Sequence, residues 1–229
     1  MDDWELCLGP ATVRSGCWMR ITAEVPIDFQ PESLLIDRDV AGDFLVTDLK
    51  FDHDSVLIST GALPGLLFSD DALIERFHLD PLKKGARVSI SVTCQSKEDR
   101  VFRGKLRGTR GTRVRDGMRR YALGFGSTLV KHNGSANINV EPQLAFNPDR
   151  LVVPSTIRDG FKIREISFRN GSTREVLDPE MHLGSFTENS VGQLTFGREL
   201  VPGQYLTISV DNVSASDLNF QAAVLGYEP

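Results

Sequence analysis

FQPESLLIDRDVAGDFLVTDLKF (residues 29–51) and FNPDRLVVPSTIRDGFKIREISF (residues 146–168) are two segments of one chain that align without a gap. Both place Phe, Pro, Leu and two further Phe residues at the same spacing. When the chain is shifted by 117 residues against itself, 12 of the 55 residues in 1–55 are identical to their partners in 118–172. A fixed-period match of this kind predicts that the fold is built from two similar halves.

A second block extends the match towards the end of each half. With a shift of 118 residues, 10 of the 41 residues in 68–108 are identical to their partners in 186–226, and GARVSISV (85–92) falls on GQYLTISV (203–210). We interpret the two blocks as an ancient tandem duplication. The predicted organisation is a first domain over residues 1–108, a basic linker over 109–117 and a second domain over 118–229.

Alternating apolar and polar residues predict the fold class of each half. In RVSISV, the residues Val88, Ile90 and Val92 point to one face of a strand, as expected for a sheet with one buried face. Similar short runs recur through both halves, separated by Gly, Pro, Asn and Asp. We therefore predict an all-β protein of two tandem antiparallel β-sandwiches, with a jelly roll as the favoured form. An immunoglobulin-like sandwich is the alternative, although its paired cysteines and intervening tryptophan are absent from the sequence.

Two local patterns refine this prediction. The segment FLVTDLKF breaks the alternation once, which predicts either a bulge between Val46 and Leu49 or a strand that is covered on both faces. The same break recurs between Ile163 and Ile166. The segment SDDALIERFHL (69–79) is the main helical candidate, because its first residues are suited to cap a helix that buries the following apolar side chains.

Composition sets the broad class of the protein. The chain has 229 residues, 40% apolar and 25% charged residues, and a net charge of −5, which is typical of a globular protein. The sequence shows neither a signal peptide nor an apolar stretch long enough to span a membrane. Its three cysteines are irregularly spaced, so we expect reduced thiols rather than a disulfide framework or a zinc site.

Positive charge is concentrated in one segment. Residues 100–120 hold nine Arg or Lys and one acidic residue, a net charge of +8, so the rest of the chain carries −13. Such a patch is suited to phosphate groups on nucleic acid or anionic lipid. It is equally consistent with a solvated linker and a strand whose basic edge prevents unwanted pairing or meets an acidic neighbouring subunit. The candidate interface residues are Arg103, Lys105, Arg107, Arg110, Arg113, Arg115, Arg119 and Arg120.

The search for catalytic and metal-binding motifs is mostly negative. The four histidines are scattered, without the His-x-His spacing that metal-dependent cupins use, and the sequence holds no GxSxG motif. Asp52, His53 and Asp54 are possible cation ligands, but we favour a polar turn after the strand FLVTDLKF, because the second repeat has Arg169, Asn170 and Gly171 at these positions. We therefore predict a protein that is not an enzyme, with no catalytic residues, no metal, no cofactor and no small-molecule substrate.

The repeated motif also carries a family resemblance. FxP(E/D)xL(L/V)(I/V), followed by a phenylalanine-containing strand and then by ISV, Phe and Gly, resembles the structural proteins of tailless icosahedral bacteriophages. The tandem arrangement is similar to that of their double-jelly-roll capsid (coat) proteins. That resemblance implies upright, adjacent barrels, three chains in each capsomer, and a shell that often overlies a membrane vesicle. At 229 residues the chain is short for that class, without room for tall loops or a long terminal arm.

The functional hypothesis follows from duplication without a duplicated polar site. We expect a virion structural protein, a capsid or shell-associated protein that self-assembles as a homo-oligomer, such as a trimer, into pseudo-hexagonal capsomers. Its partners would be copies of itself and other virion proteins, with possible contact to anionic lipid or nucleic acid through the basic residues. Its place would be the virion, assembled in the host cytoplasm. The alternative is a tandem β-sandwich binding module that recognises a receptor or a glycan.

Overall fold

The computed structural model describes residues 3–57, 61–70, 72, 80–111, 120–170, 173–190 and 196–229. The chain forms two compact units. Unit 1 comprises Met1–Leu57 and Pro64–Tyr121, and unit 2 comprises Ile58–Leu63 and Ala122–Pro229. Most of the helix predicted over residues 69–79 lies outside the described residues.

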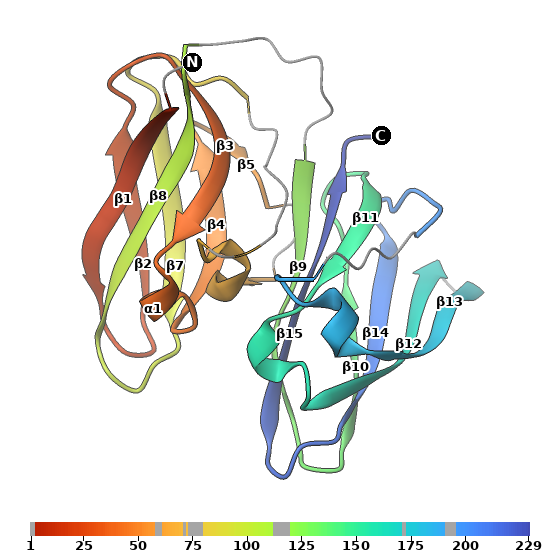
Figure 1. Cartoon of the computed structure of the whole chain (residues 1–229). Coiled ribbons are helices and arrows are strands. Elements are labelled where there is room, and N and C mark those ends of the chain that lie inside the picture. Colours follow the sequence, from red (N-terminus) through yellow and green to blue (C-terminus); the bar gives the residue numbers. More distant parts are fainter. Residues whose placement is uncertain are drawn as a thin grey trace. The chain divides into compact units, whose positions relative to one another are not determined.

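Unit 1 contains two antiparallel sheets (Figure 1). One has the strand order β1-β8-β3, and the other has the order β2-β7-β4-β5. The short helical elements α1 (Arg38–Ala41) and η1 (Gly65–Phe68) lie in the connections, and β6 (Leu63–Pro64) lies where the chain passes between the two units. The strands are β1 (Asp3–Val13), β2 (Trp18–Glu24), β3 (Phe29–Ile36), β4 (Phe44–Phe51), β5 (Asp54–Ser55), β7 (Arg87–Cys94) and β8 (Arg100–Arg110).

Unit 2 repeats this arrangement in the green-to-blue part of Figure 1. Its sheets have the orders β9-β15-β11 and β10-β14-β12-β13. The 3-10 helices η2 (Ser155–Ile157) and η3 (Leu183–Phe186) correspond in sequence to α1 and η1. The strands are β9 (Arg120–Val130), β10 (Ser135–Val140), β11 (Asn147–Val152), β12 (Phe161–Asn170), β13 (Thr173–His182), β14 (Gln204–Asn212) and β15 (Leu218–Tyr227).

Both units have the strand connectivity of a jelly roll. In each unit the first strand pairs with the last, and the second strand pairs with the one before the last. These pairings bring the ends of each unit's sequence together, which is the feature that distinguishes a jelly roll from a simple meander. The chain is therefore an all-β protein of two tandem antiparallel sandwiches, as predicted.

The predicted bulges are confirmed in both units. The register of β4 against β7 shifts between Val46 and Asp48, and that of β12 against β14 shifts between Ile163 and Glu165. An extra residue in one strand lets the apolar residues on either side of it point into the same core. The break in alternation was therefore a reliable sequence signal.

Phenylalanines fill equivalent positions in the two cores. Phe44 packs edge-to-face on Phe102, with ring centroids 5.2 Å apart and an interplanar angle of 89°. Phe161 packs on Phe220 with 5.3 Å and 84°. Such aromatic pairs add about 0.5–1.5 kcal/mol beyond the burial of their surface.

A third phenylalanine begins or precedes the same strand in each unit. The backbone N–H of Phe29 donates to the carbonyl of Leu82, and that of Phe146 donates to Leu200, both at 2.9 Å. Phe29 and Phe146 are each completely buried. The segments that opened the sequence comparison therefore have the same surroundings in the two units.

The two units differ from the predicted domain boundaries in two places. Strand β8 continues through Thr109 and Arg110, the first residues of the predicted linker, and residues 112–119 lie outside the described part of the chain. Unit 2 also includes Ile58–Leu63, where Gly61 forms a bridge with Gly124 of β9. The predicted division into two consecutive domains places this segment in the first domain instead.

Candidate interaction surface

The outward face of β8 carries three of the predicted interface residues. Arg103, Lys105 and Arg107 alternate with Phe102 and Leu106, which are both completely buried. Since successive side chains of a strand point to opposite faces, the cations lie on the solvent side of the sheet β1-β8-β3. Hydrophobic alternation thus places these three cations on one surface.

Each of these three cations forms an ion pair with a carboxylate in the same unit. Two of the carboxylates belong to β1, which pairs with β8, and the third follows the end of β3. We call the six residues the charged ladder. Its pairs are Arg103 Nε–Asp37 Oδ2 at 3.0 Å, Lys105 Nζ–Glu5 Oε1 at 3.0 Å and Arg107 Nη2–Asp3 Oδ2 at 3.2 Å.

The charged ladder has no net charge, because three cations face three anions. Each pair is solvent-exposed, so its contribution to stability is about 0–1 kcal/mol and weakens with salt. The local sequence pattern indicates the cations but not the anions that pair with them. Asp3 and Glu5 occupy alternating positions near the start of the chain, and a jelly roll pairs its first strand with its last. The jelly-roll topology and the alternation in the first strand together would have predicted Asp3 and Glu5 as partners of the cations.

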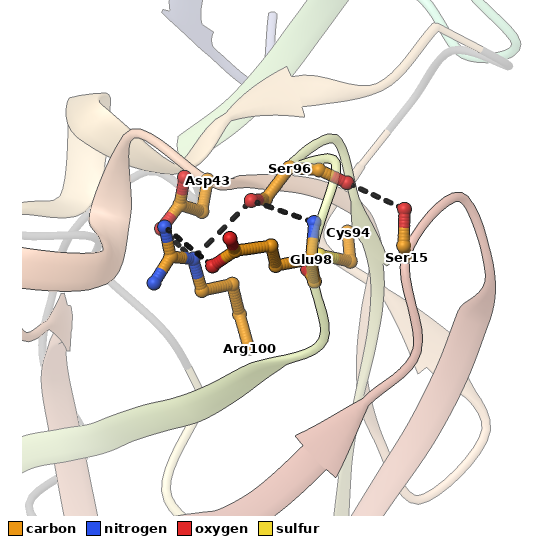
Figure 2. Close-up of polar contacts among 6 residues, drawn as sticks. All are labelled: Ser15, Asp43, Cys94, Ser96, Glu98 and Arg100. Atoms are coloured by element: carbon orange, nitrogen blue, oxygen red, sulfur yellow. Dashed lines mark hydrogen bonds and ion pairs between the residues drawn. The ribbon is translucent and has the colours of Figure 1, made fainter.

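Arg100, the first residue of β8, is used to hold a loop (Figure 2). Its Nε lies 3.1 Å from Asp43 Oδ2 and donates to Ser96 Oγ at 3.2 Å. Ser15 Oγ donates to the carbonyl of Ser96 at 2.7 Å, which joins this loop to the turn between β1 and β2. Arg100 therefore contributes to the fold of unit 1 although it belongs to the basic segment.

The other predicted interface residues are not part of the ladder. Arg110 is exposed at the end of β8, and Arg120 is half-buried as the first residue of β9. Arg113, Arg115 and Arg119 lie outside the described residues. Within the described part of the chain, the structure therefore groups three of the eight predicted cations on one sheet face.

The equivalent face in unit 2 has a different chemistry. A shift of 118 residues places Gln221, Ala223 and Leu225 of β15 at the positions of Arg103, Lys105 and Arg107. Ala223 is completely buried and Leu225 is 5% exposed. The three cations of β8 therefore have uncharged counterparts in unit 2, two of which are apolar.

Unit 2 exposes two large apolar residues at one end. Leu129, near the end of β9, and Val213, just after β14, are each 57% exposed. The strand ends that carry them are joined, because Asn212 Nδ2 donates to the carbonyl of Val130 at 2.9 Å. This pair of residues, which we call the apolar tip, is a candidate contact for another molecule.

The possible cation ligands Asp52, His53 and Asp54 form a turn. Asp52 has a φ of 53°, and its Oδ1 accepts a hydrogen bond from the backbone N–H of Arg87 at 2.7 Å. Among the described residues, no group of three His, Cys, Asp or Glu side chains is placed to hold a metal ion. None of the helices in the described ranges is long and apolar enough to cross a membrane.

Comparisons with known proteins give structural matches only. No family model and no curated protein sequence matches the chain. Its fold resembles that of the major capsid protein P2 of bacteriophage PM2, with 11% sequence identity, a TM-score of 0.41, and coverage of 100% of this chain and 98% of that one. A second match is the CUB1-EGF-CUB2 region of human MASP-1/3, with 10% identity, a TM-score of 0.24, and coverage of 98% and 99%.

Proposed function

We propose that the chain is a non-enzymatic structural protein of a virus particle, a capsid or shell-associated protein whose copies assemble through their tandem jelly rolls. The observation that carries the proposal is the repeat of one jelly roll within the chain, with the same strand order and equivalent bulges. Three copies would present six similar units around a threefold axis, and such a pseudo-hexagonal ring tiles a closed shell.

The differences between the two units support an assembly role. The cores are equivalent, whereas the faces of the sheets β1-β8-β3 and β9-β15-β11 differ in charge. In a ring of six identical units, every contact between neighbours is the same. In a pseudo-sixfold ring, two kinds of unit alternate, so their contact surfaces must differ. That requirement predicts two units that share the same core but differ on their surfaces.

The charged ladder favours a protein partner over a polyanion. Nucleic acid or an anionic membrane would have to compete with Asp3, Glu5 and Asp37 for the same cations, and these carboxylates would repel phosphate. A surface with alternating charges is suited to another surface with alternating charges, such as that of a second copy. The apolar tip supplies a separate contact of the kind that subunits bury.

The test is the mass of the native assembly, measured by light scattering after size exclusion at low and physiological salt. We expect a trimer of about 76 kDa, three times the 25.4 kDa chain, or a larger species. Exchanging both residues of the apolar tip for Asp should lower that mass. The matched control exchanges Leu144, which is also exposed, for Asp. A species of 25.4 kDa at every protein concentration and salt would refute assembly.

A further inference from the structure

The outward face of the sheet β10-β14-β12 in unit 2 contains a groove of about 370 Å³. It is lined by Asn139 of β10, Arg169 of β12, Tyr205 of β14 and Gly203, which precedes β14. Tyr205 lies opposite Arg169 in the register of β12 and β14. Three neighbouring strands therefore bring an amide, a guanidinium and a phenol ring to one surface.

The Tyr205 side chain is held in an exposed position. Its ring is 41% exposed, and a hydrogen bond from its hydroxyl to Glu141 raises the pKa of Tyr205 above the usual 10.0. Glu141 Oε1 also accepts a hydrogen bond from the backbone N–H of Gly203 at 2.8 Å. Glu141 thus joins the turn before β14 to the phenol of Tyr205.

The Asn139 amide is also oriented by a neighbour. Thr207 Oγ1 donates to Asn139 Oδ1 at 2.7 Å, so the oxygen of the amide is engaged within the sheet. The Asn139 Nδ2 group is then directed to other acceptors. Both Asn139 and Arg169 are exposed, so the N–H donors of their side chains are accessible to a ligand in the groove.

The fold itself does not require these residues. In the first repeat, Thr22, Asp52 and Arg87 occupy the positions of Asn139, Arg169 and Tyr205. There, the carboxylate of Asp52 accepts a hydrogen bond from the backbone N–H of Arg87, so these two residues of unit 1 bond to each other. At equivalent positions, unit 2 therefore has an exposed aromatic ring and a cation where unit 1 has a cation and an anion. Such a change in one unit alone indicates a role beyond the packing of the sheet.

We propose that this groove binds a saccharide that carries a carboxylate. The apolar C–H face of a sugar ring would pack on the Tyr205 ring, where dispersion and burial of apolar surface favour contact. Asn139 Nδ2 would donate to a sugar hydroxyl. Arg169 would form a charge-assisted, forked pair with the carboxylate, the strongest single interaction that the groove offers. This site does not depend on the proposed assembly, because all its residues belong to unit 2.

The experiment measures binding of 3′-sialyllactose and tri-galacturonate to the full chain by calorimetry, with lactose as the neutral comparison. We expect the acidic saccharides to bind at least about tenfold more tightly than lactose. Tyr205→Ala and Arg169→Ala should each weaken binding of the acidic saccharides at least about tenfold. Tyr205→Phe should bind within about twofold of the native chain, because it keeps the ring.

Arg87→Ala in unit 1 is the matched control, since Arg87 is equivalent to Tyr205, and it should leave binding unchanged. Thermal unfolding of each variant verifies that it folds, and Tyr205→Phe and Arg169→Gln serve where an alanine variant does not. Arg169→Gln should abolish the preference for acidic over neutral saccharides. Absence of binding at about 10 mM saccharide, or equal binding of lactose and the acidic saccharides, would overturn the proposal.

A change in assembly mass in Tyr205→Ala without a change in saccharide affinity would also overturn it, because the groove would then be a contact between copies. The mass of the native chain without saccharide tests assembly separately. The two measurements therefore distinguish a failure of the saccharide proposal from a failure of the assembly proposal.

Discussion

At the scale of single residues, the two units use different side chains for the same bonds. In unit 1 the Cys94 thiol donates to the carbonyl of Glu98 at 3.6 Å. In unit 2 the equivalent residue, Asn212, donates to the carbonyls of Val130 and Ser216, each at 2.9 Å. Asn212 is 2% exposed, so its bonds replace those that water would otherwise supply.

Asn212→Ala should destabilise the chain by about 2 kcal/mol, because it removes the buried hydrogen bond to the carbonyl of Val130 and the acceptor of the Ser214 N–H. The loss would appear as a lower urea midpoint in unfolding followed by circular dichroism. Asn219→Ala is the matched control, since Asn219 is exposed on β15, and it should change the midpoint little. Equal midpoints for the native chain and Asn212→Ala would show that these bonds add no net stability.

Asp217 gives unit 2 a pH-dependent contribution to stability. Hydrogen bonds from the backbone N–H of His132 and from the Lys131 ammonium hold the pKa of Asp217 below its usual 3.8. Because the folded-state pKa is lowered, this stabilisation is present above pH 3.8 and is lost as the pH falls through the lower, folded-state pKa.

Asp217→Asn should therefore unfold at lower urea than the native chain at about pH 7, and the difference should disappear at about pH 2. The matched control is Asp159→Asn, because the Asp159 side chain is 87% exposed and pairs only with its neighbour Arg158 among the described residues. A difference for Asp217→Asn that stays constant over this pH range would contradict an electrostatic origin.

Residue-level chemistry was only partly predictable from the sequence. Alternation in VFRGKLR placed Arg103 and Phe102 on opposite faces, which is a local property of a strand. The partner of Arg107 is Asp3, more than a hundred residues away, and only the topology brings the two together. The groove around Tyr205 was missed for the same reason, since its lining residues come from three strands that are distant in sequence.

At the scale of elements, one glycine in the last strand of each unit permits close strand packing. A Cβ atom on Gly108 would lie 1.9 Å from the carbonyl oxygen of Gln30, and one on Gly226 would lie 2.2 Å from that of Asn147. Both contacts involve backbone atoms, which cannot move aside as a flexible side chain can. The identity of these two glycines in the sequence comparison therefore has a steric cause.

Gly108→Ala and Gly226→Ala should each destabilise the chain by about 3 kcal/mol, because a strand must move to admit the methyl group. Thermal unfolding measures the effect. Gly184→Ala is the matched control, since a Cβ atom at Gly184 meets nothing within 4 Å. If Gly226→Ala melted at the same temperature as Gly184→Ala, the close approach between β11 and β15 would not be required.

Strands with buried, alternating residues were the elements that the sequence predicted best. The break around Thr47 predicted a bulge, because the apolar residues had to reach one core from both sides of an inserted residue. The ends of the strands were less predictable. Strand β8 extends into the predicted linker because Thr109 and Arg110 pair with β3, and no local residue pattern records that pairing.

At the scale of the whole molecule, one segment of the chain belongs to unit 2 although it precedes the second repeat. The segment Ile58–Leu63 belongs to unit 2, where Gly61 bridges Gly124 and the N–H of Gly126 donates to the carbonyl of Ala62 at 3.2 Å. Sequence comparison could not reveal this segment, because it lies between the two aligned blocks. Its contribution depends on a close approach of two backbones.

Gly61→Ala in the full chain tests that contribution. A Cβ atom on Gly61 would lie 1.8 Å from the carbonyl oxygen of Gly124, so the segment must move away from β9. The amide of Gly126 would then lose its acceptor, and its hydrogen exchange should accelerate at least about tenfold, whereas amides of β1 in unit 1 should exchange as before. Gly184→Ala should change neither set of amides, because a methyl group there meets no neighbour within 4 Å. Unchanged protection of Gly126 in Gly61→Ala would mean that β9 is stable without Ile58–Leu63, and the second repeat would then fold as a consecutive domain, as its sequence alone predicts.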